Sequence, residues 1–119
     1  MDWKFSADRP VYQQIVSIIR AGILTGERPP GEKIPSVRDL SAEAQVNPNT
    51  MQRALTELER EGLLLGGGTS GRTVTAQEEV LSAARDMALN ELAKECAEKF
   101  MVFGLTPKQA AELLKALEE

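Results

Sequence analysis

Apolar residues recur every three or four positions in the first quarter of the chain, which is the spacing of a helix with one buried face. The segment opens at Pro10, a residue suited to the first position of a helix because its missing N–H costs nothing there. It ends at Thr25-Gly26, where glycine allows a left-handed cap. Its apolar positions are Val11, Ile15, Ile18, Ile19 and Gly22. The pattern predicts a first amphipathic helix.

Two shorter amphipathic helices follow, joined by a tight turn at Gln45-Val46. Ser36 starts the first of them and has Asp39 three positions later, as in a capping box. Asn47 caps the second, and Pro48 opens it. The positions expected to be buried are Val37, Leu40 and Ala44 in the first and Met51, Ala54, Leu55 and Leu58 in the second. Val46 is expected to point into the core. The pattern predicts a helix-turn-helix.

A short β-hairpin is expected directly after these helices. Residues 63–65 are three leucines and predict a buried strand, and residues 72–75 predict the returning strand. The glycine-rich residues 66–71 between them are expected to form a flexible loop. Residues 32–34 are expected to be a very short extended segment. The predicted fold is therefore mainly α, with a winged helix-turn-helix of three helices and a β-hairpin wing in residues 1–75.

Residues 76–119 are predicted to form a two-helix region. A long helix is expected from about Ala76 to Phe103, ended by Gly104, and residues 106–109 form a second capping box before the last helix. Two helices cannot bury so many apolar residues alone, so we expect a symmetric partner to cover them. The alternative is that they fold back on residues 1–75. The expected dimer interface comprises Val80, Leu81, Ala84, Met87, Ala88, Leu92, Cys96, Phe100, Phe103, Leu113, Leu114 and Leu117.

The composition argues against several functional classes. Of the 119 residues, 42% are hydrophobic and 27% are charged, as in ordinary soluble domains. There is no apolar run of roughly 20 residues and no signal-peptide pattern, so we expect a cytoplasmic protein without membrane contact. The single cysteine, Cys96, excludes an internal disulfide, and the absence of histidine removes the commonest general base and metal ligand. We therefore expect neither catalysis, a metal nor a cofactor.

The charge is distributed unevenly along the chain. The formal net charge is −4, but residues 1–75 carry nine basic and nine acidic side chains and are neutral overall. Residues 76–119, with five basic and nine acidic side chains, hold the whole excess. Any electropositive surface on the first part must therefore come from the local placement of Arg38, Arg53 and Arg72. This balance predicts modest non-specific affinity for a polyanion.

The third predicted helix, from Pro48, carries polar side chains on its outer face. With Met51 directed inward and about 100° per residue, Asn49 falls at about 160°, Gln52 at about 100° and Arg53 at about 200°. Thr50 lies on the flank, within reach of a phosphate. Amide side chains can bond bidentately to adenine and arginine to guanine. This surface is typical of a helix that enters the major groove of DNA, although an ordinary solvated surface is the alternative.

Two sequence runs resemble the GntR family of bacterial transcription regulators over roughly residues 9–75. The first is Pro-Gly-Glu-Lys-Ile-Pro-Ser-x-Arg-Asp-Leu, and the second is Val-Asn-Pro-Asn-Thr-x-x-Arg-Ala-x-x-Glu-Leu-Glu-Arg-Glu-Gly. The second run and the short C-terminal region are similar to the YtrA subfamily. The symmetric dimer expected above would present two recognition helices to the inverted half-sites of a pseudo-palindromic operator, so the leading hypothesis is a homodimeric repressor on double-stranded DNA. Regulators of the YtrA subfamily often control transporter operons.

The resemblance also implies particular DNA contacts. Arg38 aligns with an arginine that reaches DNA across the helix-turn-helix, although it has Asp39 and Glu43 as alternative partners. The family touches bases and phosphates from the positions of Asn47, Asn49, Thr50, Gln52 and Arg53, and phosphate contacts are plausible at Lys33 and Ser36. The wing candidates are Thr69, Ser70, Gly71 and Arg72. With one basic residue, this wing departs from the family pattern, and its loop is expected to be disordered without DNA.

Two other functions remain open from the sequence. A winged helix can also serve as a protein-interaction module, which would present apolar anchors on its third helix in place of polar ones. A small-molecule effector could bind between protomers near Phe100, Met101 and Phe103, but such residues are more typical of plain interface core. The sequence does not indicate an effector.

Overall fold

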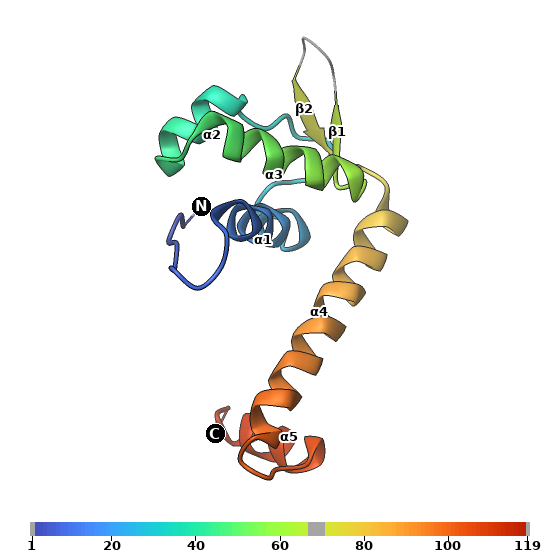
Figure 1. Cartoon of the computed structure of the whole chain (residues 1–119). Coiled ribbons are helices and arrows are strands. Elements are labelled where there is room, and N and C mark those ends of the chain that lie inside the picture. The colour runs from blue at the N-terminus through green and yellow to red at the C-terminus, as the bar shows by residue number, and fades with distance from the viewer. Residues whose placement is uncertain (1, 67–70, 119) are drawn as a thin grey trace. The chain divides into compact units, whose positions relative to one another are not determined.

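The computed structural model describes residues 2–66 and 71–118. The helices in this part are α1 (Val11–Leu24), α2 (Val37–Ala44), α3 (Pro48–Arg60), α4 (Glu78–Met101) and α5 (Pro107–Ala116), and the strands are β1 (Leu64–Gly66) and β2 (Arg72–Val74). Helices dominate, and α1 to α3 precede a two-stranded hairpin (Figure 1). The predicted winged fold is confirmed. No helix among the described residues is both long and apolar enough to cross a membrane.

Helix α1 supplies one side of the core of the winged unit. Ile15, Ile19 and Gly22 are buried as predicted. The start of the helix differs from the prediction, because Pro10 has an extended backbone (ψ 140°) and is the N-cap, so the helix begins at Val11. The side chain of Gln14 is also buried. Its amide donates to the carbonyl oxygens of Ser6 and Arg9, each at 2.8 Å, which fixes the residues before the helix.

Helices α2 and α3 form the predicted helix-turn-helix. The Ser36 hydroxyl accepts a hydrogen bond from the Asp39 N–H at 3.1 Å and caps α2. Gln45 takes the left-handed conformation (φ 56°), which turns the chain between the helices. The apolar residues of α3 are its innermost part, with Met51, Ala54, Leu55 and Leu58 all fully buried. Val46 is half-buried.

The wing is an antiparallel hairpin extended by a third segment. Leu64 pairs with Val74, Leu65 with Thr73, and Gly66 with Arg72. On the other side of β2, the Val74 N–H donates to the Glu32 carbonyl at 2.8 Å. The Ile34 N–H likewise donates to the Arg72 carbonyl at 3.0 Å, which confirms the predicted extended segment. The prediction of three buried leucines was wrong for Leu65, which is half exposed because successive strand side chains face opposite sides.

The chain divides into two compact units, Met1–Ser82 and Ala83–Glu119. This division lies seven residues later than the predicted boundary between residues 75 and 76. The physical reason is packing, because Leu81 is only 2% exposed and Val80 is half-buried at the start of α4. A Cβ at Gly62 would lie 3.9 Å from Val80 Cγ1. Leu81 is therefore a core residue of the first unit, which corrects its assignment to a dimer interface.

Candidate nucleic-acid interface

The outer face of α3 is polar, as its periodicity predicted. Asn49, Gln52 and Arg53 are exposed and Thr50 is half-buried, while the opposite side of the helix is the core. The Gln52 side-chain amide donates to the Thr56 hydroxyl at 3.3 Å along the same face. Hydrogen-bonding groups therefore lie together on the first turns of an exposed helix, which is the arrangement that base-edge recognition requires.

Asn47 has a structural task at the start of this helix. Its side-chain oxygen Oδ1 accepts a hydrogen bond from the Asn49 N–H at 2.8 Å and caps α3, as the sequence predicted. The cap satisfies one of the backbone donors that a helix start leaves unpaired. The oxygen of Asn47 therefore supports the helix, and its predicted contact with DNA stays a prediction.

Two substitutions at Asn47 are expected to separate these roles. Asn47→Ala removes the cap and is expected to lower the free energy of unfolding by about 1 kcal/mol, measured by urea denaturation. Asn47→Asp keeps a capping oxygen and adds negative charge at the helix start, so it is expected to preserve stability while weakening binding to duplex DNA. Unchanged DNA binding by Asn47→Asp would place this residue away from the phosphates.

Arg53 is held by an aromatic ring that the sequence did not single out. Its guanidinium carbon lies 3.6 Å from the centre of the Tyr12 ring, which belongs to α1. Tyr12 was overlooked because it looks like one more position on an amphipathic helix. No periodicity within α1 or α3 could reveal the pair, since the helices meet only in the folded chain.

The remaining candidates on α2 and on the segment before it are accessible. Lys33, Ser36 and Arg38 are exposed. Within the part of the chain that the structure describes, no ion pair joins Arg38 to Asp39 or Glu43, the alternative partners considered above. The hydroxyl of Ser36 caps α2, so its oxygen already accepts one hydrogen bond.

An ion pair joins the base of the wing to α3. The guanidinium of Arg72 in β2 forms an ion pair with the Glu59 carboxylate of α3, and the Arg72 side chain is only 17% exposed. A Cβ at Gly66 would lie 3.0 Å from Glu59 Oε2, so a larger residue at this position would crowd the Glu59 carboxylate. A Cβ at Gly71 would lie 3.1 Å from Lys33 Cε. Arg72 is therefore an anchor of the wing, and any DNA contact from it would have to compete with Glu59.

The tip of the wing is outside the described structure. Thr69 and Ser70, two of the predicted DNA contacts, lie among the residues that are not described, as does most of the loop predicted to be disordered. Gly71 is half-buried and has a positive φ of 85°. A side chain would be strained in that conformation, which explains the glycine directly before the returning strand.

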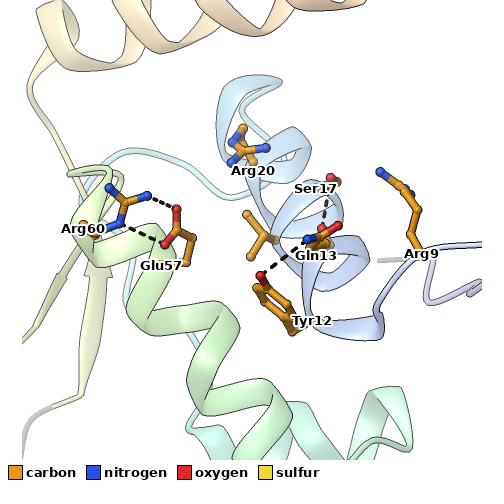
Figure 2. Close-up of a pocket in the computed structure, with 8 residues that line it drawn as sticks. Arg9, Tyr12, Gln13, Ser17, Arg20, Glu57 and Arg60 are labelled. Atoms are coloured by element: carbon orange, nitrogen blue, oxygen red, sulfur yellow. Dashed lines mark hydrogen bonds and ion pairs between the residues drawn. The ribbon is translucent and has the colours of Figure 1, made fainter.

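A polar groove of about 450 Å³ lies between α1 and α3 (Figure 2). Arg20 on its wall donates from Nε and a terminal nitrogen to the Glu61 carboxylate at 3.0 and 2.6 Å. Arg60 donates to Glu57, and this hydrogen bond lowers the pKa of the Glu57 carboxyl and raises that of Arg60. Two of the arginines that line the groove are thus neutralised by carboxylates on α3 or at its end.

The second unit leaves most of its predicted interface uncovered within a single chain. Ala84, Ala88, Cys96 and Phe100 are half-buried. The exposed predicted residues are Met87, Leu92, Phe103, Leu113, Leu114 and Leu117, at 47% to 82%. Leu89, Met101 and Val102 are equally exposed, and the helical periodicity missed Leu89 and Val102 because they lie off the predicted stripe. Thr106 and Gln109 form the predicted capping box at the start of α5.

Residues that could hold a metal ion do not cluster in the described part of the chain. Among residues 2–66 and 71–118, no group of three Cys, Asp or Glu side chains is placed to ligate one. Cys96 is a free, half-buried thiol on α4.

Comparison with known proteins identifies a matching family model and curated relatives that cover all or half of this chain. The family model described as "Bacterial regulatory proteins, gntR family" matches residues 11–74. An uncharacterized HTH-type transcriptional regulator of Bacillus subtilis, YhcF, is 31% identical over 119 residues, covering all of this chain and 98% of the relative. The HTH-type transcriptional repressor YtrA of the same organism is 46% identical over 63 residues, covering 50% of this chain and 48% of YtrA.

Solved structures share the fold. A GntR family transcriptional regulator from Listeria monocytogenes is similar at a TM-score of 0.87 and 28% identity, covering 94% of this chain and 98% of that one. The DNA-binding domain of AraR, solved in complex with the operator ORX1, is similar at a TM-score of 0.57 and 27% identity. It covers 60% of this chain and 93% of its own. The first similarity extends through both units, and the second is confined to about the length of one.

Proposed function

The chain belongs to the GntR family of bacterial regulatory proteins, and from this premise we propose that it represses transcription as a homodimer on a pseudo-palindromic operator. As a member of this family it is a DNA-binding transcription regulator and not an enzyme. The YtrA-like resemblance seen in the sequence is confirmed by the 46% identity to the YtrA repressor. The operator, the dimer and the direction of regulation are our proposals.

The observation that carries the proposal is the exposed polar face of α3. Asn49, Gln52 and Arg53 stand on the first turns of a capped helix whose other side is entirely core. An interaction module would be expected to present apolar anchors at these positions. The AraR domain, with its similar fold, was solved in complex with an operator, which supports DNA binding by the winged unit of this chain.

The apolar surface of the second unit supports the proposed homodimer. Residues such as Leu92 and Leu113 are more than half exposed in a single chain, and soluble proteins rarely leave so many large apolar side chains in water. A two-fold axis would bury the same patch from both chains and present two α3 helices to inverted half-sites. We therefore propose residues 83–119 as the dimerisation region.

The regulated genes and the direction of control are proposed on the family resemblance. The relative YtrA is named a repressor, and regulators of the YtrA-like subfamily often control transporter operons. We propose repression of such an operon in a bacterial cytoplasm, where the chromosome lies. An effector between protomers, at Phe100, Met101 or Phe103, is not required by this proposal.

Binding selection from a random pool of DNA duplexes, at near-physiological salt, tests the function directly. We expect an enriched inverted repeat whose half-sites are about one helical turn apart or a multiple of it. The salt dependence is expected to be shallow, because residues 1–75 carry no net positive charge. A folded protein that enriches no sequence would contradict specific DNA binding and favour the protein-interaction module.

Arg53→Ala tests the assignment of base reading within that site. We expect it to weaken specific binding by about 1–3 kcal/mol and to relax the base preference at one position of each half-site. The measurement is a repeat of the selection with the variant, followed by titration of the selected duplex. An equal loss on all sequences would instead make Arg53 a phosphate contact.

A further inference from the structure

The Tyr12–Arg53 pair links the first helix to the outer face of α3. The guanidinium lies 3.6 Å from the ring centre, close enough for a cation–π interaction. Tyr12 is half-buried and Arg53 is exposed. Figure 2 shows the Tyr12 side chain extending from α1 toward α3, among the residues that line the polar groove. The half-buried ring thus contacts the guanidinium of an arginine whose side chain is otherwise exposed.

Three other arginines of the first unit are held in a different way. Arg20, Arg60 and Arg72 each pair with a carboxylate, those of Glu61, Glu57 and Glu59, respectively. Each of these pairs is neutral overall. In the described residues Arg53 has no such ion pair, and its stacking partner is an uncharged ring. Arg53 therefore keeps its positive charge on the surface of residues 1–75, whose net charge is zero.

Stacking also leaves the arginine able to bind. A ring against the flat side of a guanidinium covers its face, and the N–H groups along its edge stay available for donation. A long side chain that is already ordered loses less conformational freedom when it binds, so the same contact contributes more affinity. An arginine that is held by an uncharged ring, with its edge N–H groups available, can donate two hydrogen bonds to the pair of acceptors on a guanine.

We propose that Tyr12 is a positioning residue for DNA recognition, holding Arg53 in the orientation from which it reads a base. The proposal rests on the proposed function, since it assigns Tyr12 a part in the same DNA-binding surface. It extends that surface to α1, a helix that otherwise packs behind the helix-turn-helix. Tyr12 acts through Arg53 and need not touch DNA itself.

The experiment is a double-mutant cycle on the duplex selected by the wild-type protein. Tyr12→Leu removes the ring but keeps an apolar side chain, and it is expected to raise the Kd by about two- to fivefold for each half-site. Tyr12→Phe keeps the ring and is expected to bind within about twofold of wild type. In an Arg53→Ala background, Tyr12→Leu is expected to have no further effect. Selection with Tyr12→Leu should relax the same base position that Arg53→Ala relaxes.

The outcomes separate this proposal from the proposed function. An equal loss from Tyr12→Leu with and without Arg53 would overturn the positioning role while leaving specific DNA binding intact. The positioning role would also be overturned if Tyr12→Phe lost as much affinity as Tyr12→Leu. Failure of the wild-type protein to select any duplex would overturn the proposed function, and the role of Tyr12 with it. Melting curves of every variant check that none of these losses reflects unfolding.

Discussion

Replacing Leu92 by aspartate is expected to dissociate the homodimer and to lower operator affinity roughly 100-fold or more. Leu92 is 61% exposed in the single chain, so the aspartate is hydrated in the monomer and the fold is expected to survive. In a dimer the same position would be covered, and burying an unpaired carboxylate is costly. Two linked DNA-binding units gain affinity because the second binding event is intramolecular, and that gain is lost with the dimer.

Asn90→Asp provides a matched control for this substitution. It introduces the same side chain two positions away on α4, at an exposed polar site. We expect it to keep the dimer mass in sedimentation equilibrium and the wild-type affinity for the selected duplex. A Leu92→Asp protein that kept the dimer mass would place the interface elsewhere. A monomer that bound the operator as tightly as wild type would show that the two half-sites are not read together.

Local sequence signals predicted most of the winged unit because each signal has a local physical cause. The turn at Gln45 and the cap at Asn47 fix where α2 ends and α3 begins. The spacing of the buried residues in α3 then decides which face looks outward, so Asn49 and Gln52 could be assigned to the exposed face correctly. The contact of these two side chains with DNA bases stays a prediction, since the structure shows only that they are exposed.

The parts that the sequence did not predict depend on contacts between distant segments. Tyr12 meets Arg53 only because α1 packs against α3, and Glu59 meets Arg72 only because the hairpin returns beside α3. Each side chain alone looks like an ordinary surface residue. Charge counting therefore treated Arg53 and Arg72 alike, whereas the fold neutralises Arg72 and leaves Arg53 charged.

The start of α4 illustrates the same limit in the assignment of apolar residues. Leu81 and Leu92 look equivalent in the sequence, because both lie on the expected apolar stripe of one long helix. Their surroundings differ, since Leu81 is 2% exposed and Leu92 is 61% exposed in the single chain. Periodicity identifies the face of a helix but does not distinguish an intramolecular partner from a second chain.

Leu81→Ala is expected to destabilise the winged unit by about 2–5 kcal/mol, because it leaves a cavity where a side chain only 2% exposed was packed. Leu92→Ala removes the same atoms from the same helix and is its matched comparison. We expect urea denaturation to show the large loss for Leu81→Ala only, and sedimentation under native conditions to show weakened dimerisation for Leu92→Ala only. If the Leu81→Ala protein kept wild-type stability but had the mass of a monomer, Leu81 would belong to the dimer interface, as the sequence predicted. The pair thus measures, on one helix, where the core of a protomer ends and the proposed contact between protomers begins.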